Sequence, residues 1–159
     1  MVRVGHGFDV HRLVAGRDLI LGGHKIPSPY GLAGHSDADV LLHAVIDAVL
    51  GALALGDIGQ WFPDSDARYR GASSAALLQT VLNCPEVQGW ELLNLDSTIV
   101  AERPRLAPHI PALRDTIAAI FGVPPTRVSV KATTVEGIGG IGRGEGIAAH
   151  AFLLLGRQP

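Results

Sequence analysis

Three residues of metal-binding types, Asp9, His11 and His43, stand at positions from which a fold can bring them together. The segment Gly7–His11 is typical of a β-strand, in which alternate residues face the same side, so Asp9 and His11 point the same way. His43 lies in a long apolar run that predicts a buried helix. Two imidazoles and one carboxylate commonly hold a metal that keeps an open coordination position. The pattern therefore predicts a metal site, and these ligands suit Zn²⁺ or Mn²⁺ better than Mg²⁺.

A buried histidine that is hydrogen-bonded to one neighbouring aspartate is the alternative for His43. Asp39 and Asp47 share a helical stripe with His43, each four residues away, so either carboxylate could accept a hydrogen bond from the ring and orient it. Spacing alone leaves the metal site and the buried histidine equally open.

The start of the same helix is a candidate phosphate site. Unpaired main-chain N–H groups and the helix dipole favour an anion there, and His35 could donate a hydrogen bond to a substrate oxygen. Ser36 is predicted as the N-cap, with Asp39 completing a start that resembles a capping box. A simple helix cap beside a surface histidine would explain the same residues.

A glycine-rich segment, residues 137–142, formally fits the G-x-G-x-x-G dinucleotide fingerprint. That fingerprint requires a following helix and an acidic residue further along, whereas here a predicted strand follows and little chain remains, which excludes the Rossmann interpretation. The flanking Thr133, Thr134 and Arg143 suit phosphate oxygens, and Glu136 could hold a second cation between them. A flexible hairpin is the alternative.

The elements that must position these residues form a mixed pattern. Strands are predicted over 2–13, 17–26, 90–101, 128–134 and 147–155, and helices over about 36–55, 74–84 and 108–121, with long loops over 27–34 and 57–71. Loops as long as the second are often functional. The order predicts one α+β (mixed α/β) domain over residues 1–159, with a mixed four- to five-stranded sheet and about three helices.

Composition excludes several classes of function. A formal net charge of -2 argues against broad binding to nucleic acid or to an anionic membrane. Cys84 is the single cysteine, so no intrachain disulfide can form and a cytoplasmic location is favoured. The N-terminal residues include no apolar signal segment, and His43 and Asp47 interrupt the longest apolar run, so we expect no membrane span.

Short segments along nearly the whole chain resemble one known family. They are Gly-His-Gly-Phe-Asp-Val-His at 5–11, His-Ser-Asp-Ala-Asp-Val at 35–40 with His43, Gly-Asp-Ile-Gly at 56–59, Phe-Pro-Asp at 62–64, Ala-Glu-Arg-Pro-Arg-Leu at 101–106, Lys-Ala-Thr-Thr at 131–134 with Glu136, and Gly-Arg-Gly-Glu-Gly at 142–146. In this order they resemble the 2-C-methyl-D-erythritol 2,4-cyclodiphosphate synthase family of the non-mevalonate isoprenoid pathway.

The resemblance implies cyclisation of 4-diphosphocytidyl-2-C-methyl-D-erythritol 2-phosphate with release of CMP, by a homotrimer with an active site at each subunit interface. It implies zinc, or another divalent transition metal, on Asp9, His11 and His43. A second divalent cation, Mg²⁺ or Mn²⁺, is implied at Glu136, and His35 with Thr134 would stabilise the transition state.

The resemblance also implies a set of substrate contacts. They are Asp9, Val10, His11, His35 and Ser36 around the metal; Asp57, Ile58, Gly59, Phe62, Pro63, Asp64, Ser65 and Asp66 against the methylerythritol part; Ala101, Glu102, Arg103, Pro104, Arg105, Leu106 and Ala107 around cytidine; Thr133, Thr134, Val135 and Glu136 on the diphosphate; and Arg143.

Arg143 matches an arginine beside a central trimer cavity thought to hold isoprenoid diphosphates. Some family members have lysine at Gly137 and phenylalanine at Gly140, so we expect weak or absent isoprenoid binding here.

Two other functions fit the residues less well. A metal-dependent phosphohydrolase would use the same triad but release inorganic phosphate. A non-enzymic trimeric nucleotide-binding protein would carry a structural metal, and structural zinc normally has four protein ligands where only three stand at plausible spacing here.

Overall fold

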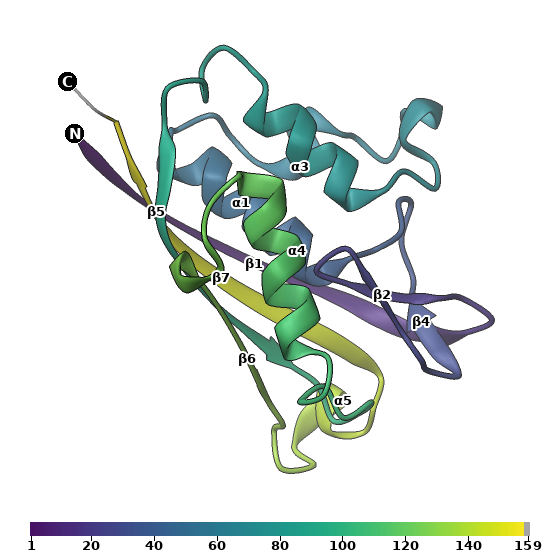
Figure 1. Ribbon diagram of the computed structural model, residues 1–159. Coiled ribbons are helices and arrows are strands. Elements are labelled where there is room, and N and C mark those ends of the chain that lie inside the picture. The colour runs from purple at the N-terminus through teal and green to yellow at the C-terminus, as the bar shows by residue number, and fades with distance from the viewer. Residues whose placement is uncertain (158–159) are drawn as a thin grey trace.

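A five-stranded mixed sheet is the centre of the computed structural model, which describes residues 1–157 (Figure 1). Its strand order is β4-β1-β7-β5-β6. The strands are β1 (Val2–Ala15), β4 (Tyr30–Leu32), β5 (Glu91–Val100), β6 (Val128–Thr133) and β7 (Gly146–Gly156). Neighbours are antiparallel except β5 and β6, which are parallel. The predicted mixed fold is confirmed.

The three predicted helices are present and cover one face of the sheet (Figure 1). They are α1 (Val40–Ala52), α3 (Ser74–Leu82) and α4 (Ile110–Phe121). Two further one-turn helices are α2 (Ile58–Trp61), in the predicted loop over 57–71, and α5 (Gly139–Gly142), in the glycine-rich segment. Turns of 3-10 type lie at Ala67–Tyr69 and Pro125–Arg127. Among the described residues, none of the helices has the length and apolar character needed to cross a bilayer.

Helix α1 lies unusually close to β1, because glycine occupies the strand where the two elements meet. A Cβ added to Gly5 would stand 1.8 Å from the carbonyl oxygen of Ala48, and one added to Gly7 would stand 1.9 Å from that of Ala44. Only residues without side chains allow this approach. The same face of β1 continues to the predicted metal ligands, so the packing of α1 on the glycines decides how near its histidine comes to them.

The predicted strand over 17–26 is wrong, because the segment forms a hairpin. Strand β2 (Leu19–Leu21) pairs with β3 (His24–Ile26) through a turn at Gly22 and Gly23. Both glycines have positive φ, 58° and 74°, which glycine adopts without steric cost. The predicted loop over 27–34 also contains β4, which pairs with the end of β1.

The predicted N-cap at Ser36 is wrong as well. Helix α1 starts at Val40, with Asp39 as its N-cap. The Asp39 carboxylate accepts hydrogen bonds from the helix's first turn and from the main chain of Gly22 and Gly23, so it ties the hairpin to the helix. Ala38 has a φ of 57°, in the left-handed region, which keeps the preceding segment out of the helix.

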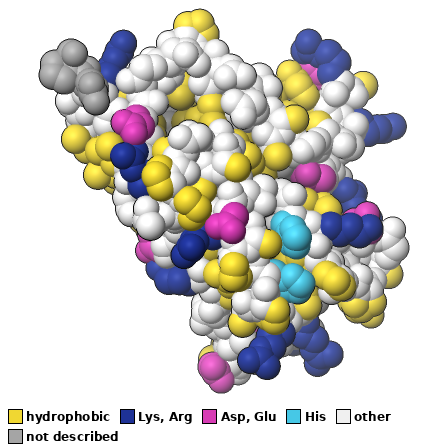
Figure 2. Space-filling view, in the orientation of Figure 1, with side chains coloured by type: hydrophobic (Ala, Val, Ile, Leu, Met, Phe, Trp, Pro, Cys, Tyr) yellow, Lys and Arg dark blue, Asp and Glu magenta, His cyan; other side chains and the backbone are white. Residues whose placement is uncertain are grey.

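The opposite face of the sheet carries an exposed group of apolar and aromatic side chains on β1 and β7. We call it the apolar sheet face; its residues are Val2, Val4, His6, Phe8, Val10, His150 and Phe152. Val4 is 70% exposed, and Phe8 and Phe152 are 49% and 51% exposed. On the helix-covered face, by contrast, hydrophobic side chains are interspersed with charged ones (Figure 2).

Candidate metal centre and substrate pockets

The side chains of Asp9, His11 and His43 converge on one point. Asp9 Oδ2 lies 2.9 Å from His11 Nε2 and 3.0 Å from His43 Nδ1, and the two nitrogens are 3.1 Å apart. Ligand atoms of a tetrahedral zinc ion with bonds of about 2.0–2.1 Å are separated by roughly 3.3 Å. This nearly equilateral triangle therefore fits a small divalent metal after opening by a few tenths of an ångström.

Each imidazole is held through its other ring nitrogen. His11 Nδ1 lies 2.6 Å from the carbonyl oxygen of Ala33 and donates to it, which leaves the Nε2 lone pair for a metal. His43 Nε2 lies 2.9 Å from Ser74 Oγ and 3.1 Å from Ser36 Oγ, which leaves Nδ1 for the metal. The two rings thus present different nitrogens to the same point.

The prediction that Asp39 or Asp47 orients His43 is wrong. Asp39 caps α1 and binds the Gly22–Gly23 turn, and burial raises its pKa to about 6 against the opposing effect of these N–H donors. Asp47 Oδ1 accepts a hydrogen bond of 2.7 Å from the Ile58 main chain. Both carboxylates accept hydrogen bonds from the main chain, and neither is hydrogen-bonded to the ring among the described contacts, although they share its helical stripe.

Charge in the triad favours a metal. Burial alone raises the pKa of Asp9, but hydrogen bonds and positive charge from His11 and His43 outweigh it, so the pKa lies well below its usual value. Burial alone lowers the pKa of His11, but the Asp9 carboxylate outweighs this and raises the pKa above 6.5. A divalent cation would take the place of the proton that Asp9 attracts to His11.

The triad opens into a pocket of about 330 Å³. Its other lining residues are Gly34, His35, Ser36, Ile58, Gly59, Phe62, Pro63, Asp64, Tyr69 and Leu77. Most of the predicted methylerythritol wall is thus present beside the triad, but Asp57, Ser65 and Asp66 do not line this pocket. Asp57 caps α2, and Asp66 binds the Arg68 side chain. Sequence reasoning missed Tyr69 and Leu77, which present apolar surface and have no chemical pattern to mark them.

A second pocket, of about 440 Å³, is formed by the whole predicted cytidine segment. It is lined by residues 101–107 together with Ala132, Thr133 and Thr134. Glu102 lies at the base of the diphosphate segment, where its Oε1 accepts hydrogen bonds from the main chains of Val135 (2.9 Å) and Gly137 (3.3 Å). Through Oε1, this carboxylate helps to organise the loop after β6, while the residue also lines the pocket.

The remaining predicted residues are divided among different parts of one chain. His35 and Thr134 line different pockets, and exposed Glu136 accepts a hydrogen bond of 3.3 Å from Thr134 Oγ1. Val10 belongs to the apolar sheet face, and Arg143 is paired with Glu145 at 2.7 Å. The described residues of one chain thus place the predicted site residues in separate pockets.

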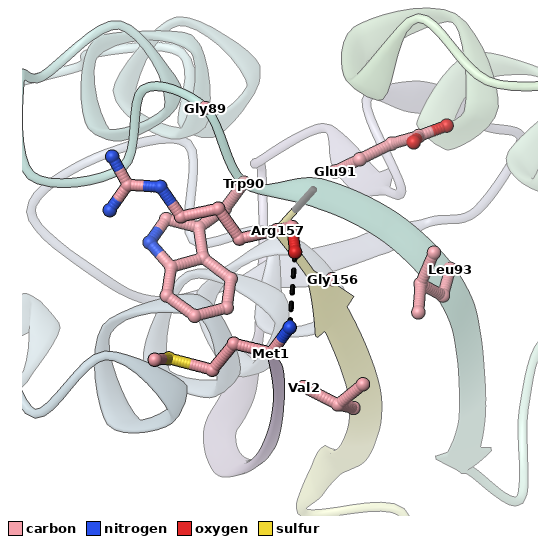
Figure 3. A pocket seen from close by; sticks show the side chains of 8 residues that line it. All are labelled: Met1, Val2, Gly89, Trp90, Glu91, Leu93, Gly156 and Arg157. Atoms are coloured by element: carbon pink, nitrogen blue, oxygen red, sulfur yellow. Dashed lines mark hydrogen bonds between the residues drawn. The ribbon is translucent and has the colours of Figure 1, made fainter. Parts of the chain in front are cut away.

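A larger cavity of about 700 Å³ lies between the first and last described residues (Figure 3). Its described lining is Met1, Val2, Gly89, Trp90, Glu91, Leu93, Gly156 and Arg157, and the amino group of Met1 donates to the Arg157 carbonyl oxygen at 3.1 Å. These lining residues include none of those predicted for the site, so size alone does not identify the functional pocket.

Fold and site together define a class: a mixed α/β domain that carries a candidate Asp-His-His metal triad in one pocket and a second, separate pocket along residues 101–107. The chain belongs to the YgbB family, whose model matches residues 2–156. It is 63% identical over 154 residues to the 2-C-methyl-D-erythritol 2,4-cyclodiphosphate synthase of Geobacter sulfurreducens, covering 97% of this chain and 98% of that one. It is 57% identical to the protein of the same name from Syntrophomonas wolfei, again over 97% and 98%. The resemblance in the sequence motifs is confirmed.

Solved structures agree. A 2C-methyl-D-erythritol-2,4-cyclodiphosphate synthase with bound CDP shares 40% identity and a TM-score of 0.88, covering 97% of this chain and 100% of that one. The bifunctional IspDF of Campylobacter jejuni has 40% identity and a TM-score of 0.94 over 99% of this chain. The match spans only 43% of that bifunctional protein.

Proposed function

We propose that the chain converts 4-diphosphocytidyl-2-C-methyl-D-erythritol 2-phosphate into 2-C-methyl-D-erythritol 2,4-cyclodiphosphate and CMP. The observation that carries the proposal is the triangle of Asp9, His11 and His43 donor atoms opening into a pocket with His35. It occurs in a chain that is similar over nearly its whole length to proteins named for this product.

The reaction requires positioning rather than an enzymic nucleophile. An oxygen of the substrate's 2-phosphate attacks the diphosphate phosphorus that is attached to the methylerythritol part. The bond from that phosphorus to the bridging oxygen breaks, and CMP leaves with the bridging oxygen. The protein needs only to align these groups and neutralise their charge. Asp9, His11 and His43 would hold the metal, which when bound supplies a Lewis acid and a template for phosphate oxygens.

The residues around the triad fit this task. His35 lines the pocket and has its Nε2 3.2 Å from the carbonyl oxygen of Asp66, a geometry from which the ring can donate to a phosphate oxygen instead. Ser36 lines the same pocket and has a hydroxyl proton to offer. The one-turn helix α2 and the loop after it supply an apolar wall for the methylerythritol part, through Phe62 and Pro63.

We propose that cytidine binds in the pocket of residues 101–107. Most of its lining comes from one contiguous segment, and the family resemblance implies that this segment reads the base largely through main-chain groups. Solved relatives in complex with CDP support a cytidine nucleotide as the ligand class.

We propose a homotrimer with active sites at subunit interfaces. Two observations support it: the apolar sheet face would be covered by association, and the two residues predicted to act together, His35 and Thr134, line different pockets of one chain. Thr134 and Glu136 of one subunit would then complete the pocket of the next. Glu136 would hold the second cation, Mg²⁺ or Mn²⁺, jointly with substrate phosphates.

We also propose zinc as the metal of the triad and the cytoplasm as the location. The first rests on two imidazole donors, which Mg²⁺ rarely takes. The second rests on a chain with a single cysteine, Cys84.

Phosphorus NMR of the product tests the function. With Zn²⁺ and Mg²⁺ present, the cytidyl substrate should yield CMP and two coupled resonances of a cyclic diphosphate, and a chelator should abolish both. Release of inorganic phosphate would identify a phosphohydrolase instead. Tight binding of CDP without any turnover would identify a nucleotide-binding protein.

A further inference from the structure

Behind His43, on the side away from the metal point, lies a short chain of polar groups that the proposed reaction does not use. Ser74 is the first residue of α3 and is fully buried, and its Oγ lies 2.9 Å from His43 Nε2. The Ser74 hydroxyl donates to Asp37 Oδ1, and Asp37 Oδ2 accepts a hydrogen bond of 3.0 Å from the Ser74 main chain. Asp37 thus binds Ser74 twice.

The direction of the proton donors in this chain follows from the groups themselves. A carboxylate can only accept hydrogen bonds, and a hydroxyl has a single proton to donate. Ser74 therefore donates its proton to Asp37 and directs a lone pair toward His43. The ring must then carry its proton on Nε2 and donate it to Ser74. Nδ1, 3.0 Å from Asp9 Oδ2, is left with the lone pair that a metal needs.

We infer that Asp37 and Ser74 are positioning residues for His43: they hold the ring in the tautomer and orientation that present Nδ1 to the metal. Metal-bound histidines usually donate their second N–H directly to a carboxylate or a carbonyl. Here the carboxylate acts through a serine, because Asp37 lies in the segment before α1 and Ser74 stands between it and the ring.

The Ser36 Oγ atom also lies 3.1 Å from His43 Nε2, but its hydrogen bonds give it a different role from that of Ser74. Its Oγ already accepts from the main chain of Ala38 at 3.1 Å, and no carboxylate takes its proton among the described contacts. Ser36 lines the substrate pocket, whereas Ser74 is fully buried. The chain through Ser74 is therefore the one that sets the donor direction, and Ser36 keeps a proton for the pocket.

The inference rests on the metal site of the proposed function, and the two can fail separately. Zinc affinity is measured by competition with a chromogenic chelator on metal-stripped, full-length protein. Wild type should bind one zinc per chain; absence of binding would refute the metal site itself. Ser74→Ala and Asp37→Asn should each weaken zinc binding by about 10- to 100-fold, the range seen when the support of a metal ligand is removed.

Ser73→Ala is the matched control. Ser73 is the neighbouring serine and caps α3 through the main chain of Ala76 at 3.4 Å, so its loss weakens the helix start without touching His43. This variant should keep zinc affinity within about threefold of wild type. Equal weakening by Ser73→Ala would mean that only the position of α3 matters, and would overturn the inference, as would wild-type affinity in Ser74→Ala.

Nitrogen-15 NMR of the histidine rings gives a readout that a purely structural role would not move. Zinc-loaded wild type should show His43 protonated on Nε2, with its proton protected from exchange by the bond to Ser74. In Asp37→Asn, which keeps the side-chain shape should Ser74→Ala fold poorly, that proton should exchange faster and shift upfield. An unchanged Nε2 signal in Asp37→Asn would refute the inference that Asp37 acts on His43 through Ser74.

Discussion

Gly7→Ala tests whether the close approach of α1 to β1 sets the metal site. The added Cβ would stand 1.9 Å from the Ala44 carbonyl oxygen and 2.9 Å from the Ala48 nitrogen, both main-chain atoms that cannot turn aside. To reach the 3.4 Å at which ordinary contact begins, helix and strand must separate by about 1.5 Å. His43 precedes Ala44, so its Nδ1 must move away from Asp9 and His11.

We expect Gly7→Ala to lose both zinc affinity and folding stability. Metal–ligand distances tolerate deviations of only about 0.2 Å, so a separation of 1.5 Å should abolish tight zinc binding. Overpacking of this kind costs about 1–3 kcal/mol in folding free energy. We expect a melting temperature several degrees lower in the metal-free protein, and no further rise when zinc is added, measured by circular dichroism and zinc competition.

Gly51→Ala is the control for this change. Gly51 lies on α1, but an added Cβ would meet only the His6 carbonyl oxygen, at 3.8 Å, an ordinary contact. Alanine in a helix should stabilise the protein by about 0.5–1 kcal/mol relative to glycine and leave zinc affinity unchanged. Wild-type zinc affinity in Gly7→Ala would refute the argument that helix–strand spacing sets the triangle.

The remaining predictions concern the triad and the assembly. His43→Ala should lose zinc binding and turnover yet keep its circular dichroism spectrum, since most of α1 packs through other side chains; an unfolded variant would indicate a structural metal. In the metal-free protein the pKa of Asp9 is lowered and the pKa of His11 is raised, so the ion pair between them stabilises the fold at pH values between the two pKa values. This stability is lost as the pH rises through the raised pKa of His11 or falls through the lowered pKa of Asp9. Zinc must displace the His11 proton, so affinity should rise by about tenfold per pH unit below that raised pKa, and calorimetry showing a pH-independent affinity from pH 5.5 to 7.5 would contradict this. Phe152→Glu should place a charge on the apolar sheet face and yield inactive monomers by light scattering, whereas an intact, active trimer would show that this face is not the interface.

Part of the site follows from local spacing. The alternation of β1 puts Asp9 and His11 on one face, and the apolar run around His43 predicts the helix that carries the third ligand. Motif order along the chain also singled out residues 101–107, which are contiguous and line one pocket, although Ala132, Thr133 and Thr134 from a distant part of the chain complete its wall.

Other predictions from local spacing were wrong because residues elsewhere in the chain or in its backbone formed different contacts. Asp39 and Asp47 share a helical stripe with His43, but the main chains of Gly22 and Ile58 claim their carboxylates. Ser36 has a good capping sequence, but the left-handed Ala38 follows it and the helix begins later. Ser74 had no pattern to mark it as a partner of His43, because it belongs to a different helix.

The sequence by itself determined the types of ligand, their strand and helix, and the family, because these depend on residue identity and on periods of two and 3.6 that neighbours along the chain impose. Only the tertiary structure decided which atoms meet. The glycines of β1 set how near His43 comes to Asp9 and His11, and Asp37 with Ser74 selects the nitrogen it presents. Contacts between residues far apart in the chain arise from packing, which local spacing does not encode.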